Sequence, residues 1–138
     1  MANRIPTYVD ATSEKISEVP AGDFLSTEGN GLAEGHSALT GTTPSISMNS
    51  GGSFSLVLSG NTTISFADAP ATGSSGFSLK VRQDAGGSGY TVTWPASVQW
   101  PGGTAPELTA TASKSDVFVF TTDDGGTSFV GLVAGKDI

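Results

Sequence analysis

This chain has few side chains that could take part in catalysis. The sequence contains one histidine, His36, and no cysteine. A serine nucleophile activated by an imidazole would therefore have to use His36. This residue lies in the glycine-rich run EGHSALTG, which supplies no group that would orient a catalytic imidazole. We expect His36 to be an exposed residue of an extended arm, and we expect the chain not to be an enzyme.

Carboxylates offer two further kinds of chemistry. Glu107 with Asp116 or Asp84 are candidates for the carboxylate pair of a glycoside hydrolase, but their local sequences indicate neither a cleft nor a raised pKa. Asp123 and Asp124 are adjacent and precede two glycines, whereas a calcium loop alternates its acidic residues. We expect a hairpin turn at this point, and we expect no metal and no cofactor.

The glycine-rich run at residues 86–89 has the composition of a phosphate-binding loop. It reads Gly-Gly-Ser-Gly, and it has neither a following helix nor the Gly-Lys-Ser/Thr ending that such loops require. We expect a turn between two strands.

Three aromatic residues are the strongest binding candidates. Tyr90 and Trp94 share a face of one predicted strand, and Trp100 follows closely. Packing in the core is one interpretation of these side chains. A platform on which sugar rings stack is the other, and in that case Trp94 and Trp100 are the ligand-contacting aromatics.

The elements that position these residues are predicted to be strands. Apolar residues make up 36% of the chain and charged residues 14%, and there are 19 glycines, a composition typical of an all-β fold with many turns. The alternation of apolar and polar residues predicts nine segments, of which the first three would form a meander of two hairpins. The segments are Ser45–Asn49, Ser53–Leu58, Thr62–Ala67, Phe77–Asp84, Tyr90–Trp94, Val98–Trp100, Leu108–Ala112, Asp116–Thr122 and Ser128–Ala134.

We expect these segments to form a single β-sandwich, jelly-roll-like and of about eight strands, over residues 44–138. Asp116–Thr122 is apolar on both faces, so it should be a central strand or lie under a partner.

Residues 1–43 differ from the rest and are predicted to be an extended N-terminal arm. They carry six of the 13 acidic residues. Thr7–Asp10 and Lys15–Val19 would pair as a short hairpin, and a helix at Ser13–Val19 is the weaker alternative because no capping box is present. The sparse apolar residues of the arm are expected to bind a partner, and those selected are Ile5, Tyr8, Val9, Ile16, Val19, Phe24 and Leu25.

The charge excludes two classes of partner. The net charge is −7 and only six residues are Lys or Arg, so we expect no binding to nucleic acid and none to an anionic membrane. The N-terminal sequence MANRIPTYVD lacks the apolar run of a signal peptide. No apolar stretch is long enough to cross a bilayer.

Two stretches resemble virion proteins of tailed bacteriophages. RIPTYVDATSEKISEVPAGDFLSTEGNGL resembles the openings of phage fibre and decoration-type proteins. The stretch from SGNTTISF through TWPASVQWPGGTAP and SDVFVF to FVGLVAG is similar to a β-domain of phage tail-fibre and capsid-associated proteins. The resemblance implies a virion location after assembly in the host cytoplasm, a homotrimer, and no catalytic residues.

Two roles are consistent with this resemblance. A capsid decoration (cement) protein would bind the major capsid protein through its N-terminal arm, and three arms acting together would raise the avidity. A tail or neck fibre component would instead bind tail proteins or host surface glycans, and the tryptophans would then carry the binding.

Overall fold

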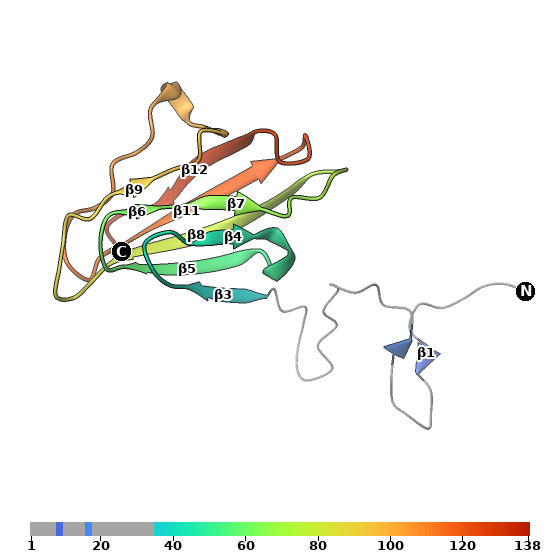
Figure 1. Ribbon diagram of the computed structural model, residues 1–138, viewed down its shortest axis with the longest axis horizontal. Coiled ribbons are helices and arrows are strands. Elements are labelled where there is room, and N and C mark those ends of the chain that lie inside the picture. Colours follow the sequence, from blue (N-terminus) through green and yellow to red (C-terminus); the bar gives the residue numbers. More distant parts are fainter. Residues whose placement is uncertain (1–7, 10–15, 18–34) are drawn as a thin grey trace, which may run out of the picture. The chain divides into compact units, whose positions relative to one another are not determined.

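The computed structural model describes residues 8–9, 16–17 and 35–138 (Figure 1). The chain divides into two compact units, Met1–Ala33 and Glu34–Ile138. In the first unit β1 (Tyr8–Val9) pairs antiparallel with β2 (Ile16–Ser17), with Val9 opposite Ile16. Both strands lie inside the two segments that were expected to pair as a hairpin.

The second unit is built on a six-stranded mixed sheet (Figure 1). Three of its strands, β3, β5 and β8, are parallel to one another, and β11 runs antiparallel to both β8 and β12. The all-β expectation is confirmed. In sheet order the strands are β10 (Val98–Gln99), β12 (Phe129–Gly135), β11 (Ser115–Thr122), β8 (Ser75–Gln83), β5 (Ser53–Leu58) and β3 (His36–Leu39).

Four short strands form two further parallel pairs. β4 (Ser45–Ser47) pairs with β7 (Ser65–Ala67), and β6 (Thr62–Thr63) pairs with β9 (Val92–Thr93). Two 3₁₀ turns, η1 (Met48–Ser50) and η2 (Pro101–Gly103), complete the elements. The short strands are the crossovers that parallel neighbours require: β4 connects β3 to β5, and β6 with β7 connects β5 to β8.

The predicted meander of two hairpins is therefore wrong. The segments at 45–49, 53–58 and 62–67 do become strands, but β5 pairs with β3 and β8 rather than with β4. Gly51 allows the residue before β3 to lie close to the residues before β5. Its φ is +123°, and a Cβ there would collide with the backbone oxygen of Gly35. The Leu108–Ala112 segment is not a strand, and the predicted Tyr90–Trp94 strand is reduced to Val92–Thr93.

The limit of the predicted arm also changes. Residues 36–39 were expected in the arm, but β3 lies in parallel beside β5, with His36 opposite Ser53 and Leu39 opposite Leu56. The second compact unit accordingly begins at Glu34 rather than at residue 44.

The core lies on one face of the six-stranded sheet. The alternation along β5, β8 and β11 buries every second residue, as the period of two predicts. Ile46 of β4 and Ile64, which lies between β6 and β7, belong to the same buried cluster. Its other members are Phe54, Leu56, Leu58, Phe77, Leu79, Val81, Phe118, Phe120 and Phe129. Burying each of these side chains stabilises the fold by about 1.5–3 kcal/mol.

Candidate functional site

The candidate site lies where two tryptophans precede the sharp turn at Pro101–Gly103, and we call the segment Trp94–Pro106 the tryptophan corner. Trp94 follows β9, and Trp100 follows β10 and precedes η2. Gly102 and Gly103 have φ of +74° and +75°, a conformation that glycine adopts without steric cost. The Gly103 N–H donates to the Trp100 carbonyl at 2.9 Å, which closes the turn.

Both tryptophans pack one side of their rings against the core. Their ring centroids are 5.3 Å apart, and Trp94 lies 4.9 Å from Phe118 and 5.5 Å from Phe120. Gly131 of β12 makes room for Trp100, since a Cβ there would lie 2.8 Å from the indole. The core therefore covers part of each indole ring, and both residues remain only partly buried.

Two cavities adjoin the tryptophan corner. A cavity of about 390 Å³ is lined by Tyr90, Trp94, Glu107 and neighbouring residues. A second cavity of about 320 Å³ is lined by Trp100, Leu132 and others, and Pro106 lines both. Aromatic faces with one carboxylate beside them are suited to a ring with hydroxyl groups, because the ring stacks while the carboxylate accepts hydrogen bonds. Here the structure brings a sequence-predicted ligand aromatic, Trp94, together with the carboxylate of Glu107.

Gln83 positions this site, and it was not selected from the sequence. Its amide nitrogen donates to the carbonyls of Tyr90 at 2.9 Å and Thr109 at 3.1 Å, and its amide oxygen accepts from the Tyr90 N–H at 3.1 Å. The side chain is buried. It therefore joins the two segments that line the larger cavity. The signal was present, because Gln83 continues the inward-facing series Phe77, Leu79 and Val81.

Asp116 is a structural carboxylate. It is 2% exposed, and it accepts from the Thr109 N–H at 2.6 Å, the Thr109 hydroxyl at 2.7 Å and the Asp137 N–H at 3.0 Å. Glu107 is exposed instead, and Asp84 accepts from the Ala85 N–H at 2.8 Å. The two buried oxygens of Asp116 thus hold the segment that lines the cavities against β11.

His36 is not an arm residue but lies on the edge strand β3. Its Nδ1 is 3.1 Å from the Ser53 hydroxyl and its Nε2 is 3.2 Å from the Ser55 hydroxyl. It is exposed, as expected. Among the residues that the structure describes, no group of three or more His, Asp or Glu side chains is placed to hold a metal ion.

The glycine-rich run at 86–89 lies in the loop between β8 and β9, as predicted. Gly87 lies against the Tyr90 ring, where a Cβ would be 2.5 Å from the hydroxyl oxygen.

Asp123 and Asp124 form the predicted hairpin turn between β11 and β12. The Ser128 hydroxyl donates to Asp124 at 2.6 Å, and the Ser128 N–H and the Thr122 hydroxyl donate to it as well. These hydrogen bonds, that of the Ser128 hydroxyl above all, lower the pKa of Asp124 from 3.8 to about 2.

Acid should weaken this turn in a defined window. Because the folded pKa of Asp124 is lowered, its contribution to stability is complete above pH 3.8 and is lost as the pH falls to about 2. We expect Asp124→Asn to lower the thermal midpoint at pH 7, and the difference from wild type to shrink between pH 4 and pH 2. Circular dichroism melts at these pH values measure this. Asp123→Asn is the control, and an equal pH dependence of both variants would contradict the assignment.

Most of the residues predicted to form a partner-binding arm lie outside the part of the chain that the structure describes. Ile5, Val19, Phe24 and Leu25 lie outside the described residues. Tyr8, Val9 and Ile16 are described only through the backbone pairing of β1 with β2.

Comparison with known proteins gives no family for this chain. No family model matches it, and neither a curated protein nor a solved structure is significantly similar to it. Within the described ranges, no helix has the length and apolarity needed to cross a membrane.

Proposed function

We propose that this chain is a non-enzymatic structural protein of a tailed-bacteriophage virion, and specifically a trimeric capsid decoration protein. In this role the N-terminal arm attaches the protein to the major capsid protein and thereby stabilises the shell. The observation that carries the proposal is the division of the chain at Ala33 and Glu34. The second unit is a compact β-unit with its own apolar core, and in this proposal the acidic first unit makes the attachment.

Two further features support this role. The resemblance to phage fibre and decoration-type proteins covers both units. Two carboxylates that could take part in catalysis are instead engaged in structural hydrogen bonds. Asp116 and Asp124 accept hydrogen bonds from neighbouring backbone groups. The proposal includes the finer architecture, in which β4, β6, β7 and β9 form the second layer of a jelly-roll-like β-sandwich over the six-stranded sheet.

Removal of the first unit tests the attachment. A variant lacking residues 1–33 should keep the β-rich circular dichroism spectrum and the thermal midpoint of the full chain, because the buried cluster that the structure describes lies entirely after Glu34. It should no longer co-sediment with purified particles that have been stripped of this protein. Retained binding by the truncated chain would overturn the role of the arm. A low, tail-like copy number in intact particles would overturn the capsid location.

The second candidate is a tail or neck fibre component that binds host surface glycans. The cavity lined by Tyr90, Trp94 and Glu107 and the neighbouring cavity lined by Trp100 favour it. Glu107→Gln should weaken glycan binding about tenfold, which corresponds to one charge-assisted hydrogen bond.

A glycan array followed by calorimetry on the best ligand measures this loss. The same variant should leave the thermal midpoint unchanged, because the Glu107 side chain is exposed and only its backbone carbonyl, which accepts from Lys136 Nζ at 2.7 Å, is engaged. Absence of any glycan ligand for the wild-type chain would remove this candidate.

A further inference from the structure

The face of the six-stranded sheet that points away from the core carries a strip of apolar side chains. Val119 of β11 lies opposite Leu132 of β12, and Val130 lies opposite Thr121. Leu132 is 45% exposed and Val130 is 46% exposed, and Val119 is only partly buried. We call Val117, Val119, Val130 and Leu132 the apolar strip. Contiguous exposed apolar side chains of this kind mark an interaction surface.

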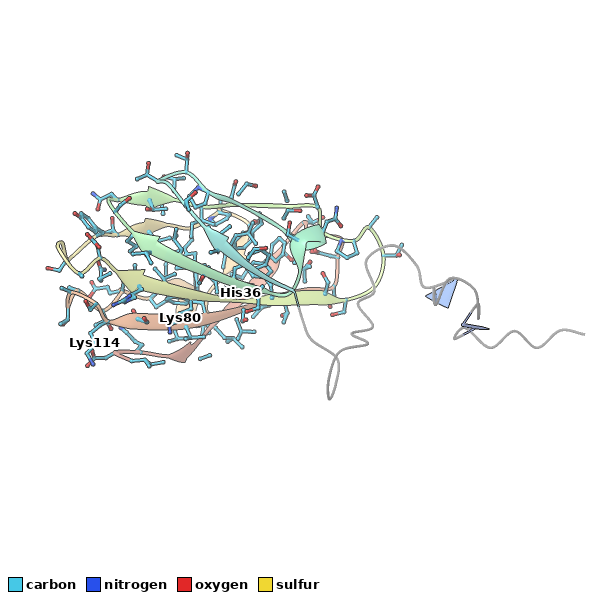
Figure 2. All side chains as sticks on the ribbon, turned by 90° about the horizontal axis from the view of Figure 1, so that it is seen from below. His36, Lys80 and Lys114 are labelled. Carbon is cyan, nitrogen blue, oxygen red and sulfur yellow. The ribbon has the colours of Figure 1, made fainter. Side chains whose placement is uncertain are left out.

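Cationic side chains lie directly beside the apolar strip. Lys80 of β8 is opposite Val117 of β11 on one side and opposite Ser55 of β5 on the other. Arg82 lies two residues further along β8, on the same face. Figure 2 labels Lys80 on this sheet.

Lys80 and Arg82 form no ion pair with a carboxylate in the described part of the chain. The ion pair found there joins Lys114 to Asp137, at 3.6 Å. Arg82 Nε donates instead to the Ser113 carbonyl at 3.1 Å. The sheet face therefore combines an apolar strip with positive charge, although the chain as a whole has a net charge of −7.

A complementary surface lies at the turns of the same unit. Asp123 and Asp124 lie in the hairpin turn, and Asp68 lies in the loop after β7. The two turns are adjacent, because a Cβ on Gly125 would lie 3.3 Å from the Ala71 carbonyl oxygen. No Lys or Arg occurs in residues 59–79 or 115–135. We call Asp68, Asp123 and Asp124 the acidic end.

We propose that the outer face of the six-stranded sheet binds the acidic end of a second copy of this chain. The contact is head-to-tail, because it joins two different surfaces of the same molecule. A contact between two identical sheet faces would instead bring Lys80 and Arg82 of both copies together, which like-charge repulsion opposes. Head-to-tail contacts close into a ring when the rotation allows it. The inference rests on the trimeric part of the proposed function and assigns its interface.

Charge reversal in the full-length chain tests this contact. Lys80→Glu and Asp123→Lys should each weaken self-association about tenfold or more, measured as the dissociation constant from sedimentation equilibrium. The double variant, Lys80→Glu with Asp123→Lys, should recover association, because the reversed charges again face each other. Lys136→Glu is the matched control, because Lys136 Nζ donates to the Glu107 carbonyl at the cavity side, and it should associate as wild type does.

The apolar strip has its own test. Val130→Ser should also weaken association while the thermal midpoint of the diluted, monomeric protein stays close to wild type, because this side chain is exposed. Raising the salt from about 0.05 M to about 0.5 M should weaken the wild-type contact through screening.

A wild-type chain that is monomeric at all concentrations overturns the inference, as does an oligomer that none of these changes affects. A monomeric chain would also remove the trimeric part of the proposed function, whereas an unaffected oligomer would remove only this interface. Attachment to capsids is measured separately by co-sedimentation with particles.

Discussion

Phe120→Ala should lower the free energy of unfolding of the second unit by about 3–5 kcal/mol, the usual cost of removing a buried phenylalanine ring. Phe120 is fully buried, and its ring contacts aromatic rings from three other parts of the chain. Its ring centroid is 5.0 Å from Phe66 of β7, 5.1 Å from Phe77 of β8 and 5.7 Å from Trp100. Alanine leaves a cavity at the point where these three aromatic rings meet. Urea unfolding followed by tryptophan fluorescence measures the loss.

The neighbouring residue supplies the control for this variant. Thr121 lies on the same strand but on the outer face, and it is exposed. Thr121→Ala should cost less than about 1 kcal/mol. Since a domain of this size has only about 5–15 kcal/mol of stability, the two variants should be clearly separable. Equal costs would mean that the Phe120 ring does not stabilise the core of the second unit.

The faces of the long strands were predictable because alternation is a local property. Phe77, Leu79 and Val81 point inward in the structure, and Lys80 and Arg82 point outward, as the period of two indicated. The interior position of Asp116–Thr122 followed from apolar residues on both of its faces, and β11 indeed has a neighbour on each side. The Asp-Asp-Gly-Gly turn was likewise readable from four residues.

The pairing of the strands was not predictable in the same way. Alternation determines which side chains are buried but not which strand lies alongside, and parallel partners are separated by an intervening crossover. β5 therefore pairs with β8 although β6 and β7 lie between them in the sequence. β3 was missed because HSAL is short and is surrounded by glycines.

Only part of the candidate site could be predicted from the sequence. Trp94 and Trp100 could be selected as aromatic residues close in the chain, and the structure brings their rings together. The cavities beside them depend on Pro106 and Leu132, which lie far apart in sequence. The Asp116–Thr109 pair that supports the cavity wall could not be predicted either, because an acidic residue at the start of an apolar strand is usually expected to be exposed to solvent.

Asp116→Asn should lower the free energy of unfolding by about 2–4 kcal/mol, although it changes only an oxygen for an NH₂ group. Both carboxylate oxygens accept hydrogen bonds, from the Thr109 N–H and hydroxyl and from the Asp137 N–H. An amide offers one acceptor oxygen, so its NH₂ group must face donors in a buried position. At least one of these N–H or hydroxyl donors then loses its partner.

Glu107→Gln, a matched change of carboxylate to amide at an exposed position, should shift the unfolding free energy by less than about 0.5 kcal/mol. Denaturant unfolding of both variants at pH 7 makes the comparison. If Asp116→Asn were as mild as Glu107→Gln, the Asp116 carboxylate would not be fixing the cavity wall, and a chemical role for it would have to be reconsidered. A large cost confined to Asp116 instead ties the shape of the tryptophan corner to one buried acceptor, because the Thr109 segment that it holds also receives the amide of Gln83.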